Sequence, residues 1–160
     1  MMEKTLELIE TLQSSESYHF IDVLPETISH VGYFELEEYL LVNCLDDFSQ
    51  KICRIIIKLI TYYDAEIYLT EFPEEKSRLK FYEYEYKNIR SKSLQEIHKI
   101  ISYIIKNDIS SVQIIFPKKN ILVSINGEFS VAIYGENEEV LKLVEKLVNQ
   151  ENLFLRKSIN

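Results

Sequence analysis

The strongest constraint on the fold is an apolar stripe at helical spacing in the second quarter of the chain. Large apolar side chains recur there every three or four residues, while lysine and arginine occupy the opposite side. This spacing predicts an amphipathic helix over residues 47–63, with Asp46 or Asp47 as its N-cap. A helix with one apolar side must bury that side, so we expect it at the centre of the core. The stripe consists of Ile52, Ile55, Ile56, Leu59, Ile60 and Tyr63.

Other periodic segments predict further helices and strands. Ser93 and Glu96 have the spacing of a capping box, which opens a helix, and Asn126-Gly127 is typical of a two-residue hairpin turn. Residues 19–24 fit either an edge strand or an extended loop, and residues 153–155 fit a terminal strand or a docking segment. Helices are predicted over residues 3–13, 34–45, 93–106 and after Gly135, and strands over residues 65–72, 79–87, 112–116, 121–125 and 129–134.

The order of these elements predicts an α+β fold. We expect a single domain over residues 1–160, with a single layer of mostly antiparallel sheet, about five strands, packed against helices. Residues 65–72 and 79–87 are expected to pair as neighbouring strands. In the second of these, period-two alternation puts tyrosines on one face and glutamates on the other.

The helix predicted from Phe34 to Leu45 is apolar on two sides. Leu36, Leu40 and Cys44 belong to one stripe, whereas Phe34 and Leu45 lie nearly opposite. Such a helix is either buried between layers or turns one side to a partner. The second alternative predicts a homodimer formed through residues 34–45.

The sequence contains no pattern that predicts catalysis or metal binding. His19, His30 and His98 are not spaced as metal ligands, and neither Cys-x-x-Cys nor a phosphate-binding loop is present. Cys44 and Cys53 lie in apolar settings without an activating neighbour, which is typical of free thiols. We therefore expect a non-enzymatic protein with no catalytic residues, no cofactor and no metal.

The charge balance bears on the kind of partner. The chain has 26 acidic and 18 basic residues and a net charge of −8, a field that repels nucleic acids and anionic membranes and attracts basic proteins. The opening residues carry charges where a signal peptide would be apolar, and no apolar stretch reaches the length of a membrane span. We expect a cytoplasmic protein that binds a basic protein, and neither nucleic acid nor membrane.

Tyrosine and glutamate alternate in one stretch, which suggests a contact surface. Carboxylates ringed by tyrosines suit the capture of a surface rich in lysine and arginine, because charges speed association and aromatic rings supply buried area. We predict a partner-binding site with Glu74 and Glu75 at its rim. Its central residues are Tyr82, Glu83, Tyr84 and Glu85.

In size, acidity and the tyrosine–glutamate texture of residues 81–87, the chain resembles bacterial toxin-immunity proteins. These are small, cytoplasmic, acidic α+β domains that cap a basic toxin domain, so the resemblance implies neutralisation of a basic partner. The chain is also similar, more loosely, to the acidic chaperones of secreted bacterial effectors, which would imply binding of an effector segment. The middle and last predicted helices fit the chaperone pattern, but the helical region over residues 34–63 does not.

Overall fold

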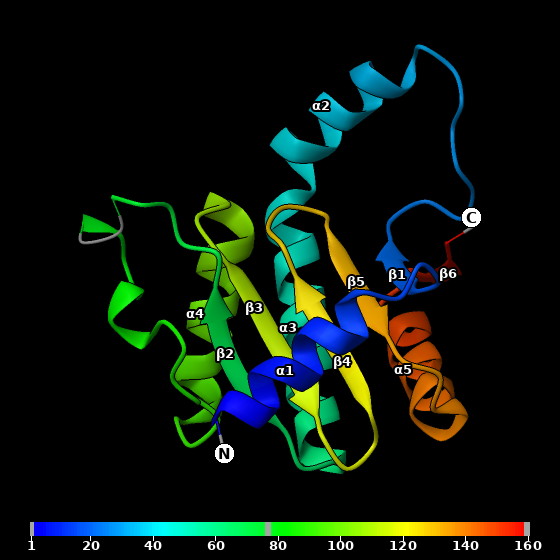
Figure 1. The fold of residues 1–160 in the computed structure, drawn as a ribbon. Helices are drawn as coiled ribbons and strands as arrows, with labels where there is room; N and C mark the ends of the chain where they lie inside the picture. Colours follow the sequence, from blue (N-terminus) through cyan, green and yellow to red (C-terminus); the bar gives the residue numbers. More distant parts are fainter. Residues whose placement is uncertain (1, 76–77, 159–160) are drawn as a thin grey trace.

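A computed structural model describes residues 2–75 and 78–158 and contains one six-stranded sheet (Figure 1). Every strand pairing is antiparallel, and the strand order is β2-β3-β4-β5-β1-β6. The predicted α+β class is confirmed, with six strands in place of about five. The strands are β1 His19–Asp22, β2 Glu66–Thr70, β3 Ser111–Phe116, β4 Ile121–Ile125, β5 Val131–Tyr134 and β6 Phe154–Lys157. The helices are α1 Met2–Gln13, α2 Tyr33–Asn43, α3 Leu45–Tyr62, α4 Leu94–Asn107 and α5 Glu138–Gln150, with a 3-10 turn, η2, at Tyr82–Tyr84.

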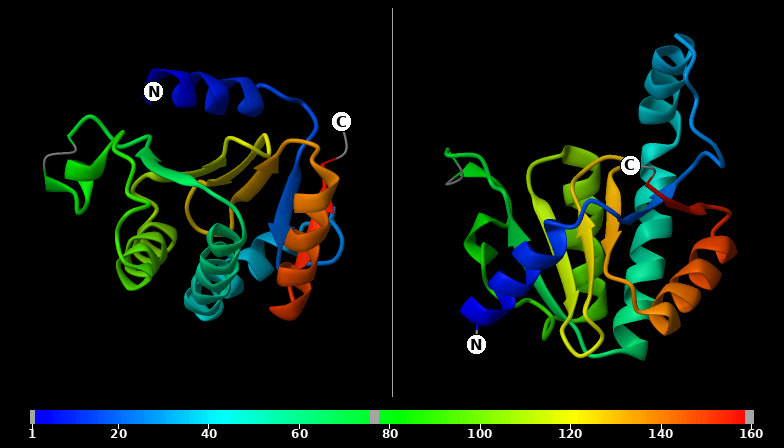
Figure 2. Two further views of the ribbon diagram at one scale, coloured as in Figure 1. Left: turned by 90° about the horizontal axis from the view of Figure 1, so that it is seen from below. Right: turned by 45° about the vertical axis from the view of Figure 1, so that its right-hand side comes forward.

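Helices lie on both faces of the sheet (Figure 2). Helices α3, α4 and α5 cover one face, and the strand residues that face them form a continuous apolar core, among them Ile67, Ile114 and Ile133. Helix α1 crosses the other face, where Ile9 packs in a second, smaller apolar cluster. Polar groups are also paired on this side, since the Gln13 amide donates to the Gln113 side-chain oxygen at 3.2 Å.

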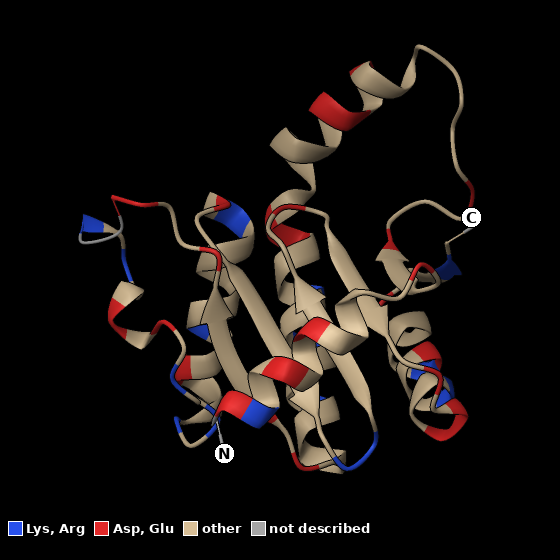
Figure 3. Cartoon of the chain, in the orientation of Figure 1, with Lys and Arg blue, Asp and Glu red and all other residues tan. Residues whose placement is uncertain are grey.

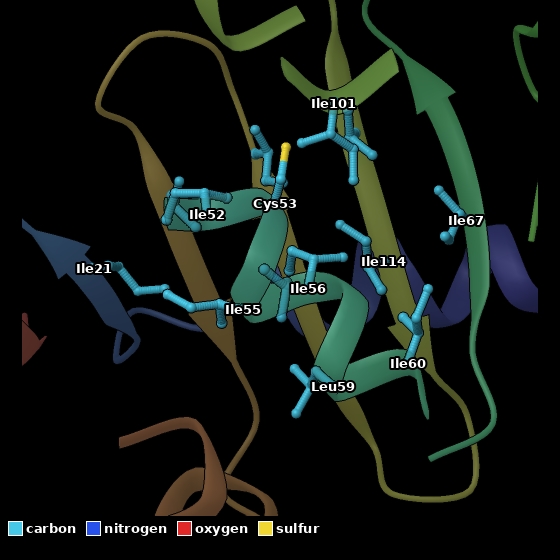
Figure 4. Packing of buried hydrophobic residues seen from close by; sticks show 14 of the residues in the cluster. Ile21, Ile52, Cys53, Ile55, Ile56, Leu59, Ile60, Ile67, Ile101 and Ile114 are labelled. Carbon is cyan, nitrogen blue, oxygen red and sulfur yellow. The ribbon is translucent and has the colours of Figure 1, made fainter. Parts of the chain in front are cut away.

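Helix α3 occupies the centre of the core, as its stripe predicts (Figure 4). Ile52 and Ile56 are fully buried, and Leu59 is almost so. The helix begins before the predicted N-cap because Cys44 joins it to α2. The Cys44 N–H donates to the Leu40 carbonyl at 2.8 Å, and the Cys44 carbonyl accepts from the Phe48 N–H at 2.9 Å. Helices α2 and α3 therefore meet at Cys44, which caps both, with no loop between them.

The prediction of a strand over residues 79–87 is wrong. Phe81 and Tyr86 have positive φ angles of 72° and 59°, which no regular strand accommodates, and η2 lies between them. The one β-type contact of this segment is an isolated parallel bridge between Glu85 and Leu69. The hairpin predicted with residues 65–72 is therefore also wrong, because β2 pairs with β3.

The segment that follows β2 instead protects the outer edge of the sheet. The Tyr86 N–H donates to the Leu69 carbonyl at 3.0 Å, and the Ile89 N–H donates to the Ile67 carbonyl at 2.9 Å. The Asn88 side-chain oxygen accepts from the Ile67 N–H at 3.0 Å. An open edge strand is a template for unwanted pairing, so these bonds occupy groups that would otherwise be exposed.

Two further predictions are confirmed in part. Residues 19–24 contain a strand, but β1 lies between β5 and β6 and is not an edge, because the terminal segment forms β6 outside it. Strands β4 and β5 pair as predicted, but their turn is longer than two residues, since the Asn126 N–H donates to the Ser130 carbonyl. Gly127 has a φ of +91°, and a Cβ there would lie 2.1 Å from the Asp108 carboxylate.

The buried side of α3 gives a direct test of this packing. Replacing Ile56 by alanine removes a fully buried side chain between α3 and the sheet, so the free energy of unfolding should fall by about 2–5 kcal/mol. The exposed Lys58 of the same helix is the matched control, and Lys58→Ala should change stability by less than about 0.5 kcal/mol. Denaturant unfolding measures both. Equal losses in the two variants would contradict the placement of α3.

Candidate partner-binding site

The feature of the structure that most suggests binding is a projecting segment, residues 25–43, which we call the arm (Figure 1). It consists of an exposed stretch, residues 25–32, followed by α2, and no residue of α2 is buried. Large apolar side chains exposed together on one helix mark an interaction surface. The exposed fractions are 78% for Val31, 73% for Phe34, 59% for Tyr39 and 78% for Val42.

The arm is held in place by α3. A helix of 11 residues is marginal in water on its own, and the N-cap of α2, Gly32, supplies no side-chain cap. Cys44 bonds to Leu40 of α2 through its N–H and to Phe48 of α3 through its carbonyl, so α2 follows directly from the start of α3. Of the two alternatives for the two-sided apolar helix, burial between layers is wrong. The homodimer through Phe34 to Leu45 stays a prediction.

An open pocket of about 420 Å³ lies between the inner side of α2 and the turn that joins β4 to β5. Apolar side chains of the pocket come from α2, from Val23 and Leu24 just before the arm, and from the turn, and carboxylates lie among them. The lining residues are Asp22, Val23, Leu24, Tyr33, Glu37, Leu40, Leu41, Asp108, Asn126, Gly127, Glu128, Phe129 and Ser130. Four of these lining residues are acidic. No lysine or arginine lines the pocket in the part of the chain that the structure describes.

One of the four carboxylates is already neutralised. Arg156 of β6 forms an ion pair with Asp22 at 2.6 Å, and its guanidinium also donates to the Thr27 hydroxyl, which ties the arm to the sheet. Glu37, Asp108 and Glu128 form no ion pair with any residue in ranges 2–75 and 78–158. The pocket therefore keeps negative charge that a cationic group can balance.

Tyr33 fixes one of these carboxylates at the pocket wall. Burial, followed by its hydrogen bond to Glu37, raises the pKa of Tyr33 above its ordinary value. The phenol therefore stays protonated at neutral pH and donates to Glu37 one helical turn away.

The arm concentrates the negative charge of the protein. It contains Glu26, Glu35, Glu37 and Glu38 and neither lysine nor arginine, so it carries half of the net charge of −8. Figure 3 shows acidic segments along α2 and no basic ones. A long-range field of this kind steers cationic partners toward the arm.

The structure places the sequence-predicted site elsewhere. Tyr82, Glu83, Tyr84 and Glu85 lie in and after η2, beside α4 and the β2 edge, away from the arm (Figure 1). Tyr82 and Glu83 are exposed, as are Glu74 and Glu75, but Tyr84 and Glu85 are half-buried. The common tyrosine face that motivated the prediction does not form, because the segment is not a strand.

The surroundings of that segment are also less acidic than its sequence indicates. The Lys92 ammonium lies 4.0 Å from the centre of the Tyr84 ring, and the Lys80 ammonium lies 5.2 Å from the centre of the Phe81 ring. Tyr84 also stacks on Phe81, with 6.3 Å between ring centres. The Tyr84 ring is thus already covered by a cation and by the Phe81 ring. Binding at Tyr82–Glu85, with Glu74 and Glu75 at the rim, stays a prediction.

The histidines offer no metal centre in the parts of the chain that are described, where no group of three or more His, Cys, Asp or Glu could hold an ion. His98 is partnered, since its Nε2 lies 2.7 Å from the Gln50 side-chain oxygen. Burial, and then the charge of Lys157, lower the pKa of His19, which lines a shallow pocket with Glu138 and Glu145.

The two cysteines differ in a way that a labelling experiment detects. Burial raises the pKa of Cys53 to about 12, and its thiol donates to the His98 carbonyl, whereas Cys44 is half-buried at the base of the arm. At mildly alkaline pH, iodoacetamide should therefore alkylate Cys44 while Cys53 stays unmodified. Peptide mass spectrometry measures both, with the denatured protein as the control in which both react. Rapid labelling of Cys53 in the folded protein would contradict its burial.

Comparison of the chain with protein-family models, curated proteins and solved structures gave no match. Its function must therefore be inferred from its own residues. None of the described helices has both the length and the apolar composition needed to cross a bilayer.

Proposed function

We propose that this is a non-enzymatic binding protein that neutralises a basic protein partner, in the manner of a toxin-immunity protein, through the arm and its acidic pocket. The observation that carries the proposal is the arm itself. It exposes Phe34 and Val42 on a helix with no buried residue, and it bears half of the net negative charge. Apolar anchors within a charged surround are the usual composition of a binding surface.

The magnitudes show why both kinds of group are needed. Covering the exposed parts of the four apolar side chains of the arm that are more than half exposed would contribute about 4–9 kcal/mol, at roughly 1.5–3 kcal/mol for each fully buried side chain. Association of two proteins costs about 4–15 kcal/mol in lost freedom of motion. Apolar contact alone therefore barely balances that cost. The additional favourable energy comes from cationic groups that meet the carboxylates of the arm and the pocket.

A second candidate, a secretion-type chaperone, is favoured by the same apolar exposure. A chaperone presents a long apolar groove to an extended segment of its client. The pocket beneath the arm is about 420 Å³, which accommodates a few side chains rather than a segment, and four carboxylates line it. The arrangement fits a folded, charged partner better than an unfolded one.

The proposal is tested with the product of the neighbouring gene as the first partner to try, purified in folded form. The variant Phe34→Ser/Val42→Ser should weaken binding by about a hundredfold or more, because both side chains are anchors. The variant Tyr62→Ser removes another exposed aromatic ring outside the arm and should leave the affinity unchanged. Calorimetry gives the affinities, and thermal unfolding checks that each variant keeps its fold.

Other outcomes identify the competing sites and functions. If Glu83→Lys/Glu85→Lys abolishes binding while the arm variant does not, the site is the one at Tyr82–Glu85. If folded partners do not bind but unfolded effector segments do, the chaperone function replaces the proposed one. Association with a basic partner should also slow steeply as salt is added, since charge steering is screened.

A further inference from the structure

The outer side of α2 has a regular order of side chains. Val31, Glu35, Glu38 and Val42 follow one another at the i, i+4, i+7, i+11 spacing, which places them along one line of a helix. Val31 precedes α2 by two residues, but its carbonyl accepts from the Phe34 N–H, so it continues the same line. All four side chains are exposed.

Two aromatic rings flank this line. At about 100° per residue, Phe34 lies on one side of it and Tyr39 on the other. The outer face of α2 thus has an apolar residue at each end, an aromatic ring on each flank and two carboxylates at its centre. Neither Glu35 nor Glu38 has an ion-pair partner among the residues that the structure describes.

We infer that this face docks an amphipathic helix of the partner, with apolar residues that meet Val31, Phe34, Tyr39 and Val42 and two basic residues that meet Glu35 and Glu38. The inference rests on the proposed function and names the chemistry of the partner at the same surface. A helical partner follows from the shape of the arm. A single convex helix offers ridges and grooves that match another helix, and it offers no open strand edge to extend.

Charge selects a basic helix over a second copy of this chain. Two antiparallel copies place valine against valine along the central line only when Val31 of each copy faces Val42 of the other. That register puts Glu35 of each copy opposite Glu38 of the other. A parallel arrangement puts each glutamate opposite itself. Both arrangements bring like charges together at the centre of the interface, which costs energy and specificity.

A synthetic peptide tests the inference without knowledge of the natural partner. The probe is an alanine-rich, end-capped helix with leucine at the positions equivalent to Val31, Phe34, Tyr39 and Val42. It carries arginine at the positions equivalent to Glu35 and Glu38. One matched peptide has glutamate in place of each arginine, and another has serine in place of each leucine. Fluorescence anisotropy measures the affinity of each for the whole protein at several salt concentrations.

The arginine peptide should bind, and its affinity should fall as salt is added. The glutamate peptide should bind at least about tenfold more weakly than the arginine peptide, and the serine peptide should not bind. The protein variant Glu35→Gln/Glu38→Gln should lose the preference for arginine over glutamate. The variant Glu83→Gln/Glu85→Gln, which changes the same number of charges elsewhere, should keep that preference.

Three results would overturn the inference. The first is that the arginine peptide does not bind, and the second is that the arginine and glutamate peptides bind equally well. The third is self-association of the protein at low salt that Phe34→Ser abolishes, as measured by analytical ultracentrifugation, since a second copy would then cover the face. An arm dimer held against like charges should instead strengthen with salt, so the sign of the salt effect separates the two occupants.

Failure here can be told apart from failure of the proposed function. If the peptides fail but a folded basic partner binds and needs Phe34, the arm is the site and its partner is not a helix of this kind. If a folded basic partner binds equally well without Phe34 and Val42, the function has been assigned to the wrong surface, whatever the peptides do.

Discussion

The packing of α3 against the sheet is the interaction on which the arm depends. Eight residues of α3 are buried, and the apolar ones each contribute about 1.5–3 kcal/mol, whereas α2 buries none. The start of α3 therefore carries α2, whose own contacts leave every one of its side chains at least partly exposed. Phe48, in the first turn of α3, also packs on Phe129 with 5.0 Å between ring centres, and Phe129 lines the acidic pocket. The core thus supports both walls of the candidate site.

Local patterns predicted the elements that are stabilised locally. The stripe of α3 and the capping box at Ser93 both depend on residues within a few positions of each other, and the Ser93 hydroxyl accepts from the Glu96 N–H as expected. The segment over residues 79–87 fails for the opposite reason. Its tyrosine–glutamate alternation is typical of a strand, but in the structure it protects the outer edge of β2. The other edge of β2 pairs with β3, which comes later in the sequence, after α4. No short-range pattern contains that information.

The candidate site was predicted only in part, for a similar reason. The two-sided apolar pattern of α2 left open whether one side faces a partner, and the pocket below combines Asp22, Asp108 and Glu128 from separate parts of the sequence. The strand face expected to carry Glu83 and Glu85 does not form, and Lys80 and Lys92 lie over the Phe81 and Tyr84 rings of the same segment. The composition gives only the sign of the net charge. The fold decides which carboxylates remain unpaired.

The edges and faces of the sheet are covered or guarded against pairing with other chains, whereas the arm is exposed. The β2 edge is occupied by the Tyr86 and Ile89 amides, and the β6 edge is short and carries Arg156 and Lys157, two features that discourage pairing between sheets. Helices lie on both faces. A chain that protects its edges in this way still leaves four large apolar side chains of the arm more than half exposed. The glutamates among them keep the surface of the arm hydrated in the free protein. Under the proposed function, the same carboxylates also select a cationic partner.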